Sequence, residues 1–343
     1  SSAASDVYKR QLLTATAATL ADSAFWGASA AGISGNASDF SADSQLIAFE
    51  SDAGNLTLND FNGRQDIFVR DLGSGVTTLV SMTPDGVSGS GSSFNPQLSA
   101  DGRYVVFESE VKNLVTNDTN GTARDVFVRD LLNQTTTLIS ESLTGGSGNN
   151  LSRLEAMSSD GQLVVFGSHA SNLVTMPTSG HYHLFVRDLA GETTRLVSVN
   201  FDNTATGNGL VHRFSPSKLS RDGRFVTFES DSTDLVTTDL NGVYTDVFVR
   251  DLQLNTTALV SSNEPGTGSG NHQSSNPQFD PTGRFIVFVS KATDLVLGNP
   301  FRNQVYLRDT LLNHTTLISV DNTFDGETPV QEVTSFFAFS PDG

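Results

Sequence analysis

The sequence contains no cysteine, a single tryptophan and few basic residues. Without cysteine, a disulfide framework, a thiolate metal site and a cysteine nucleophile are all excluded, and such a composition suits an exported protein. The 20 Lys and Arg residues are outnumbered by 38 Asp and Glu, which gives a net charge of -18. A nucleic-acid partner is therefore not expected, because phosphate contacts need Lys and Arg. No stretch approaches the roughly 20 apolar residues of a membrane span, so membrane insertion is not expected either.

Short apolar runs, rich in β-branched and aromatic residues, alternate with Gly, Ser, Thr and Asn, a pattern typical of many strands joined by turns. One of these runs recurs about every 60 residues, which indicates a repeat protein. The copies read "FSADSQLIAFES" from Phe40, "LSADGRYVVFES" from Leu98, "MSSDGQLVVFGS" from Met157, "LSRDGRFVTFES" from Leu219 and "FDPTGRFIVFVS" from Phe279, and "FSPDG" opens a sixth copy at Phe339.

Each unit also carries a run such as "DVFVRDL" at 125–131, a run such as "TTLIS" at 136–140, and a short run such as "NPQLS" at 95–99. Four strands in each of several repeats predict an all-β propeller with antiparallel four-stranded blades of about 60 residues. We expect one propeller domain over residues 1–343, with six blades. The repeat units are placed at about 36–93, 94–152, 153–213, 214–275 and 276–334, and an incomplete blade shared between the termini combines 6–20 with 335–343. A fragment of a longer array is the alternative.

The run "SADGRYVVFES", followed by "DVFVRDL" and "TTTLIS", resembles the WD-like repeat of TolB-type β-propellers. The resemblance extends over nearly the whole chain and implies the propeller fold. It implies no particular function, because propellers host binding, scaffolding and catalysis alike.

We label the strands of a blade a to d. Antiparallel strands place the a–b and c–d turns at one end of a blade and the b–c and d–a loops at the other. The b–c and d–a loops, such as "DAGNLTLNDFNGRQ" and "TPDGVSGSGSSF", are the long ones. Long loops in a compact fold are commonly functional, so any site is expected at this end, which we call the loop end.

Three b–c loops share the pattern Asp-x-Asn-Gly followed by a second Asp. Carboxylates, an amide oxygen and a glycine turn meet part of what calcium requires, and an Asx turn explains the same residues without a metal. The candidate calcium ligands are Asp60, Asn62, Asp66, Asp118, Asn120, Asp125, Asp239, Asn241 and Asp246.

Other residues at the loop end could contact a ligand, and these candidates are Arg153, His181, His183, His212, Arg213 and His272. By contrast, the Arg-Asp pair of each "FVRD" run is repeated in all five units, which indicates a structural function. We expect its arginine to reach a carboxylate of a neighbouring blade, with Glu50, Glu108 and Glu229 as candidate partners.

These features favour a non-catalytic binding or scaffold propeller that is exported to the periplasm or the extracellular space and is monomeric. Its ligand, a protein or a glycan, would bind the loop end, and calcium would stiffen the loops before binding. The alternative is the propeller domain of a larger hydrolase, acting on peptides or glycans, whose catalytic domain lies outside this chain. A propeller that is itself catalytic would need an acid–base pair, and neither G-x-S-x-G nor H-E-x-x-H occurs.

Overall fold

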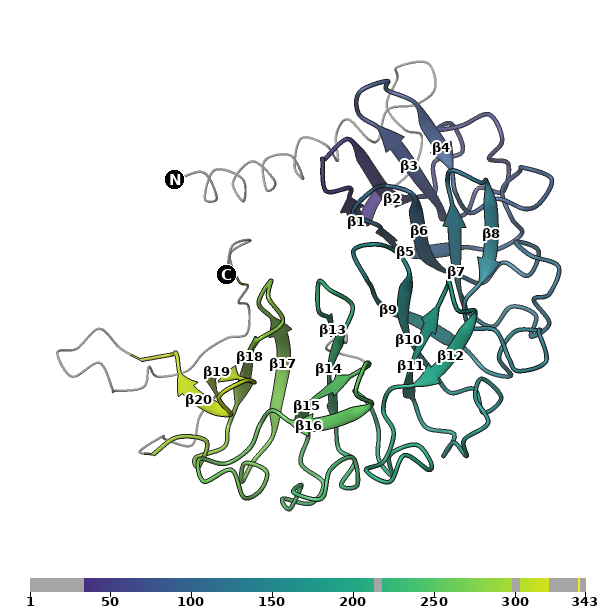
Figure 1. The fold of residues 1–343 in the computed structure, drawn as a ribbon. Coiled ribbons are helices and arrows are strands. Elements are labelled where there is room, and N and C mark those ends of the chain that lie inside the picture. Colours follow the sequence, from purple (N-terminus) through teal and green to yellow (C-terminus); the bar gives the residue numbers. More distant parts are fainter. Residues whose placement is uncertain (1–33, 213–217, 298–302, 321–338, 340–343) are drawn as a thin grey trace. The chain divides into compact units, whose positions relative to one another are not determined.

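The structure, a computed structural model, describes residues 34–212, 218–297, 303–320 and Phe339. These residues form twenty β-strands and no helix, and the strands make five four-stranded sheets (Figure 1). The expected all-β fold with antiparallel four-stranded blades is confirmed. No helix in the described part of the chain could cross a membrane.

The strand order in every sheet follows the chain, so each blade is a simple meander. The first blade contains β1 (Ser34–Phe40), β2 (Leu46–Ser51), β3 (Asp66–Asp71) and β4 (Thr77–Leu79). The second contains β5 (Ser93–Leu98), β6 (Tyr104–Ser109), β7 (Asp125–Asp130) and β8 (Thr135–Leu138). The third contains β9 (Ser152–Met157), β10 (Leu163–Ser168), β11 (His183–Asp188) and β12 (Thr193–Leu196). The fourth contains β13 (Lys218–Leu219), β14 (Phe225–Ser230), β15 (Asp246–Asp251) and β16 (Thr256–Leu259), and the fifth contains β17 (Ser274–Phe279), β18 (Phe285–Ser290), β19 (Gln304–Asp309) and β20 (His314–Leu317).

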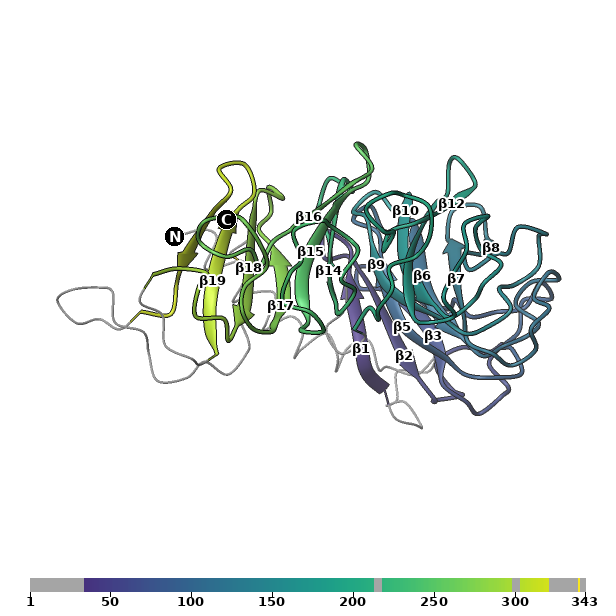
Figure 2. The ribbon, with the colours of Figure 1, turned by 90° about the horizontal axis from the view of Figure 1, so that it is seen from below.

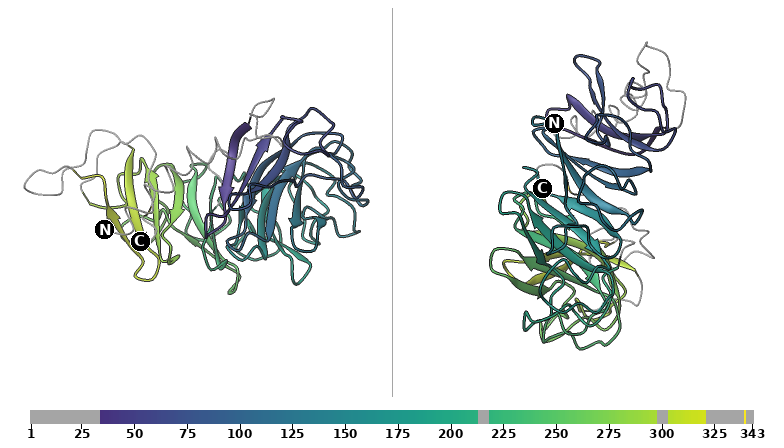
Figure 3. Two further views of the ribbon diagram at one scale, coloured as in Figure 1. Left: turned by 90° about the horizontal axis from the view of Figure 1, so that it is seen from above. Right: turned by 90° about the vertical axis from the view of Figure 1, so that its right-hand side faces the viewer.

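The chain divides into two compact units, one of residues 1–175 with 186–195 and one of residues 176–185 with 196–343. The boundary falls inside the third blade, where β11 and β12 both run across it. Within the second unit, the fifth blade lies beside the fourth (Figures 2 and 3).

The apolar core lies between blades as well as within them. In the first unit, Ile67 and Val80 of the first blade share one buried cluster with Val105 and Phe127 of the second. Strands b and c are therefore buried on both faces, as β6 and β7 show, and their residues are continuous apolar runs rather than alternating ones. Strand d alternates exposed and buried residues because it is the outer edge of its blade.

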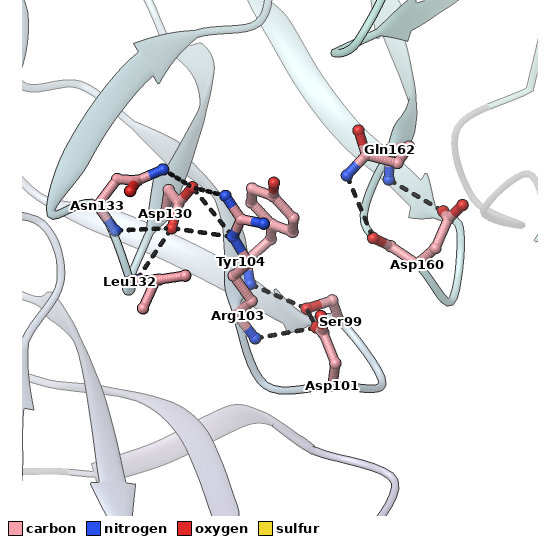
Figure 4. A network of polar contacts seen from close by, with 9 residues as sticks. All are labelled: Ser99, Asp101, Arg103, Tyr104, Asp130, Leu132, Asn133, Asp160 and Gln162. Atoms are coloured by element: carbon pink, nitrogen blue, oxygen red, sulfur yellow. Dashed lines mark hydrogen bonds and ion pairs between the residues drawn. The ribbon is translucent and has the colours of Figure 1, made fainter.

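The short turns are held by the repeated "FVRD" aspartate (Figure 4). Asp130 accepts backbone N–H bonds from Leu132 and Asn133, and its carboxylate pairs with Arg103 of the a–b turn at 2.7 Å. The Arg103 guanidinium lies over the Tyr104 ring, 4.7 Å from its centroid. The same ion pair joins Arg224 to Asp251 and Arg284 to Asp309.

Replacing Arg103 by methionine should lower the free energy of unfolding only slightly at pH 7, since the pair is partly exposed. The Arg103 hydrogen bond holds the pKa of Asp130 at about 2. A lowered carboxyl pKa contributes stability above the unfolded pKa, near 4, and that contribution is lost as the pH falls toward 2. Urea unfolding at pH 7 and pH 3 should therefore show a smaller difference between variant and wild type at pH 3. Arg64→Met, at an exposed arginine, is the control, and an equal effect of both variants would contradict the assignment.

The repeated "FVRD" arginine does not behave uniformly. Arg187 donates to Glu141 of the preceding blade at 2.9 Å, as expected, whereas Arg129 reaches the Met82 sulfur and Arg250 the Asn203 amide oxygen. The common partner is instead a threonine on strand d, as in Arg129–Thr136 at 3.0 Å.

The three candidate glutamate partners join blades by another route. Each accepts a hydrogen bond from a backbone N–H in strand a of the next blade: Glu50 from Asn95, Glu108 from Leu154 and Glu229 from Asn276. All three glutamates are buried. The Arg-Asp pair is structural, as predicted, but the partner proposed for its arginine was wrong for Glu108, which pairs instead with the b–c loop residue Arg124.

The incomplete sixth blade was placed on residues 6–20 and 335–343, which lie outside the described residues except for Phe339. The Phe339 side chain packs against Val287, Val289 and Val305 of the fifth blade. Closure of the ring and the count of six blades stay predictions.

Candidate functional site

The loops of the loop end are tied to one another within and between blades. Within a blade, the Asn117 side chain donates to the Gly145 carbonyl, which joins the b–c loop to the d–a loop. Between blades, the Asn172 amide oxygen accepts from the Asn149 N–H at 2.9 Å. The equivalent contacts are Asn113 with Ser90, Asp234 with Asn208, and Asp294 with Asn271. Within each unit, hydrogen bonds therefore join neighbouring loops of the loop end to one another.

Glycine is required in the d–a loops because the next blade approaches their backbone closely. A Cβ at Gly91 would lie 2.9 Å from the Glu110 carbonyl oxygen, and a Cβ at Gly270 would lie 2.7 Å from the Leu295 side chain. Neither distance is compatible with a side chain without rearrangement. The Gly-rich runs are thus a packing feature of the loop end.

The Asn of each Asp-x-Asn-Gly loop fastens the b–c loop to the d–a loop. Its side-chain N–H donates to a glycine carbonyl in all three cases: Asn62 to Gly89, Asn120 to Gly148 and Asn241 to Gly270. In the first loop the Asn62 Oδ1 also accepts from the Arg64 N–H at 2.7 Å, which is the Asx turn. The Asn therefore has a structural function whether or not a metal binds.

The second Asp of each loop is the first residue of strand c and is fully buried. Asp66 Oδ1 accepts from the Ser81 hydroxyl at 2.6 Å, and Asp125 and Asp246 accept in the same way from Ser140 and Ser261. Burial raises the pKa of all three carboxyls to about 7. This serine ends the "TTLVS" run and recurs in every unit. Its recurrence could have indicated from the sequence that the serine has a structural partner.

The first Asp of the loop has less hydrogen bonding than its burial calls for at Asp60 and Asp239, whereas Asp118 accepts from the Ser147 hydroxyl at 3.2 Å. Desolvation raises the pKa of Asp60, Asp118 and Asp239. Asp60 Oδ2 is buried without a hydrogen-bond partner. Neither carboxylate oxygen of Asp239 has a hydrogen bond of ordinary geometry, although the Ser269 hydroxyl lies near enough to lower the pKa slightly. The three Asp-x-Asn-Gly loops contain no histidine. In the described residues, no three His, Asp or Glu side chains lie close enough together to hold a metal ion by themselves.

The six residues proposed to contact a ligand fall into different environments. His183 is buried, and its two ring nitrogens face the hydroxyls of Ser179 at 2.6 Å and Ser198 at 3.4 Å, so it occupies the structural position of Asp66. His181 is exposed, and its ring centroid lies 6.5 Å from that of His183. Arg153 lies on β9 with its Nε buried and without a hydrogen bond, and Arg213 lies outside the described residues.

His212 and His272 come together around one b–c loop of the second unit. The His272 ring stacks on Tyr244 with centroids 4.5 Å apart, and burial lowers the pKa of His272. The neighbouring Thr245 hydroxyl lies 3.2 Å from His212 Nε2. The sequence analysis identified the two histidines but missed Tyr244 and Thr245, because these residue types do not recur at the same position in the other units.

This group does not form a catalytic triad. The Asp231 carboxylate and the Thr245 hydroxyl both face the same nitrogen of His212, Nε2, at 3.8 Å and 3.2 Å. A triad needs the acid and the hydroxyl on opposite ring nitrogens, so that the acid orients the base. The arrangement can bind polar groups, but it does not activate the Thr245 hydroxyl in this way.

Two cavities among the described residues lie at equivalent positions of the repeat. One of about 630 Å³ in the second unit is bordered by Thr237, Arg250 and Thr257. Another, of about 440 Å³ in the first unit, is bordered by residues at the equivalent repeat positions, Thr116, Arg129 and Thr136. A crevice that recurs with the repeat is a consequence of blade packing and does not mark a ligand site.

No protein-family model matches the chain, and no curated protein does. Among solved structures, the chain is similar to tricorn protease at 12% identity, covering 80% of this chain and 25% of that one, with a TM-score of 0.44. It is similar to an oligogalacturonate lyase from Vibrio parahaemolyticus at 13% identity, covering 87% and 82%, with a TM-score of 0.34. It is similar to puromycin hydrolase at 10% identity, covering 80% and 36%, with a TM-score of 0.44. The chain thus spans a quarter of the tricorn protease chain and about a third of the puromycin hydrolase chain.

Proposed function

We propose that this protein is a non-catalytic binding or scaffold propeller of the TolB-type repeat family, exported and monomeric, whose protein or glycan ligand binds the loop end of the fourth blade. The observation that carries the proposal is the b–c loop there. Leu240, Val243 and Tyr244 are 73%, 84% and 41% exposed, although the loop that presents them is tied to its neighbours.

Exposed apolar side chains on a rigid support are typical of recognition surfaces. The loop backbone is held by Ser269, whose hydroxyl accepts from the N–H groups of Leu240 and Asn241 at 2.9 and 3.0 Å. Little ordering entropy would be lost on binding to such a surface. His212 and His272 place hydrogen-bonding groups next to the apolar tip, which supports a ligand with both apolar and polar groups.

Comparison of the repeats supports the same location. The residue after the first strand-a serine differs in every unit: it is Phe94 in the second blade, Arg153 in the third and Ser275 in the fifth, and His212 is its counterpart in the fourth. By contrast, positions that hold the turns of a single blade together, such as the "FVRD" aspartate, are the same in every unit. Variation at this edge of the loop end is what a site added to a common scaffold would show.

The test is a screen of a peptide phage library and a glycan array on the immobilised chain, with selected ligands titrated against two variants. Leu240→Ser/Val243→Ser/Tyr244→Ser should weaken binding at least tenfold, since apolar hot-spot contacts contribute about 2 kcal/mol or more each. Leu132→Ser/Leu254→Ser/Leu311→Ser removes equally exposed side chains from the c–d turns and should change binding less than twofold. Selection of no ligand, or of ligands sensitive only to the turn variant, would reject the proposal.

The second candidate function is the propeller domain of a larger hydrolase. Because His212, Asp231 and Thr245 do not form a triad, the catalytic groups of such a hydrolase would belong to another domain. Hydrolysis of casein or of a p-nitrophenyl ester by this chain alone, abolished by His212→Ala, would overturn the non-catalytic assignment.

A further inference from the structure

We propose that the three Asp-x-Asn-Gly loops, at Asp60, Asp118 and Asp239, each bind one calcium ion. Side-chain oxygens that are buried without a hydrogen-bond partner gather in these loops. Across the described residues eleven buried side-chain N and O atoms lack a partner, and six of them belong to the motif. They are Asp60 Oδ2, Asn120 Oδ1, Asp125 Oδ2, Asn241 Oδ1 and both carboxylate oxygens of Asp239.

These oxygens are on side chains with little access to water. Asp60 is 4% exposed, Asp239 is 7% exposed and Asp125 is fully buried. A buried acceptor without a donor is unfavourable, and a buried carboxylate without one is more so. Each of the three loops thus holds at least one buried oxygen that the hydrogen-bond donors of the protein do not satisfy and that a bound cation would.

Each loop brings two carboxylates into one turn, Asp60 with Asp66, Asp118 with Asp125 and Asp239 with Asp246. A divalent cation bound between two carboxylates is attracted by both. The donors are carboxylate and amide oxygens only, a set that suits Ca²⁺ and not Zn²⁺ or Cu²⁺.

The third blade shows that the turn itself does not need the carboxylates. It has Pro177 and His183 where the first blade has Asp60 and Asp66, yet Gly180 keeps the positive φ of Gly63, 77° against 60°. The tie to the d–a loop also persists, because the Ser179 N–H donates to the Thr206 hydroxyl at 3.1 Å. Since the turn forms without either aspartate, an Asx turn does not explain why the two aspartates occur together elsewhere.

The three sites are not equivalent. In the fourth blade three oxygens lack partners, two on Asp239 and one on Asn241. In the first blade Asn62 Oδ1 already accepts from the Arg64 N–H, so Asp60 Oδ2 is the oxygen of that loop that lacks a partner. We therefore expect the tightest binding at Asp239, which precedes the exposed Leu240 in the sequence.

The experiment is calorimetric titration of the chelator-treated chain with CaCl₂, together with thermal unfolding in EDTA, in CaCl₂ and in MgCl₂. We expect three ions per chain and a melting temperature raised by millimolar calcium, because a ligand that binds only the folded state stabilises it. Asp239→Asn should remove the tightest of the three binding events and leave two. Asp60→Asn/Asp118→Asn/Asp239→Asn should remove all calcium binding while circular dichroism still shows a folded β protein.

The matched control is Asp85→Asn/Asp202→Asn/Glu264→Gln, which removes the same charge from exposed positions in d–a loops. It should keep three ions and the full calcium-dependent rise in melting temperature. The proposal is overturned if the wild-type chain binds no calcium, if magnesium stabilises it equally, or if the control loses binding as the motif variant does. Circular dichroism and the single Asp239→Asn variant separate loss of a site from loss of the fold.

Discussion

Phe127→Ala should lower the free energy of unfolding by about 3–5 kcal/mol, the largest effect we expect from a single substitution in the described residues. Phe127 is fully buried on strand c of the second blade. Its ring stacks on Phe107 of strand b with centroids 5.9 Å apart, and both belong to the cluster that joins the first and second blades. Truncation would leave a cavity at the contact between two blades, where neither sheet can close it alone.

Urea unfolding followed by fluorescence and circular dichroism would measure this effect. Phe127→Leu keeps most of the volume and should be less destabilising, by under about 1.5 kcal/mol. Phe201→Ala makes the same chemical change at a residue that is 51% exposed, and it should alter stability by no more than about 0.5 kcal/mol. Equal losses for Phe127→Ala and Phe201→Ala would contradict the described packing.

Glu108→Ala should lower the free energy of unfolding by about 2–4 kcal/mol, because it leaves a buried N–H without its acceptor and removes the buried one of the two carboxylates that pair with Arg124. Glu108 Oε1 accepts from the Leu154 N–H of the third blade at 3.1 Å, and Oε2 pairs with Arg124 at 3.0 Å. The carboxylate is almost fully buried, so water cannot replace it.

Glu110 provides a matched comparison because it pairs with the same Arg124, at 2.8 Å, from an exposed position. Glu110→Ala should therefore be worth about 0–1 kcal/mol, and Glu108→Gln should recover part of the loss by keeping an acceptor for Leu154. Thermal unfolding of the three variants would distinguish them. Similar losses from Glu108→Ala and Glu110→Ala would show that the contact between blades does not carry the effect.

Both effects come from contacts between blades, and the same holds for the loop end. The Asn172 oxygen that accepts from Asn149 of the preceding d–a loop joins two repeats, and the glutamate bonds do so from the inner strands. A ligand site at the loop end therefore has a support built from more than one repeat. Removing one of these ties should loosen a loop without unfolding its blade, because each blade keeps its own four-stranded sheet.

The sequence alone determined the all-β propeller fold, the four strands of each blade and the division between short turns and long loops. The signals are of two kinds. Short β-branched runs bounded by Gly, Asp and Asn predict the strands, and the recurrence of these runs about every 60 residues predicts the blades. Periodicity also identified the "FVRD" pair as structural, since a residue needed by every blade appears in every copy.

Only the tertiary structure decided which copy each side chain reaches. Glu108 lies 46 positions from Leu154, and nothing in a repeated pattern indicates whether a glutamate meets its own blade, the next blade or an arginine. Burial was equally hidden, because the same Asp can be a solvated turn residue or, as Asp239, a carboxylate enclosed without a donor. Only the structure shows that Tyr244 and Thr245 belong to the candidate site, because the d–a loops place His272 and His212, which are distant in the sequence, against them.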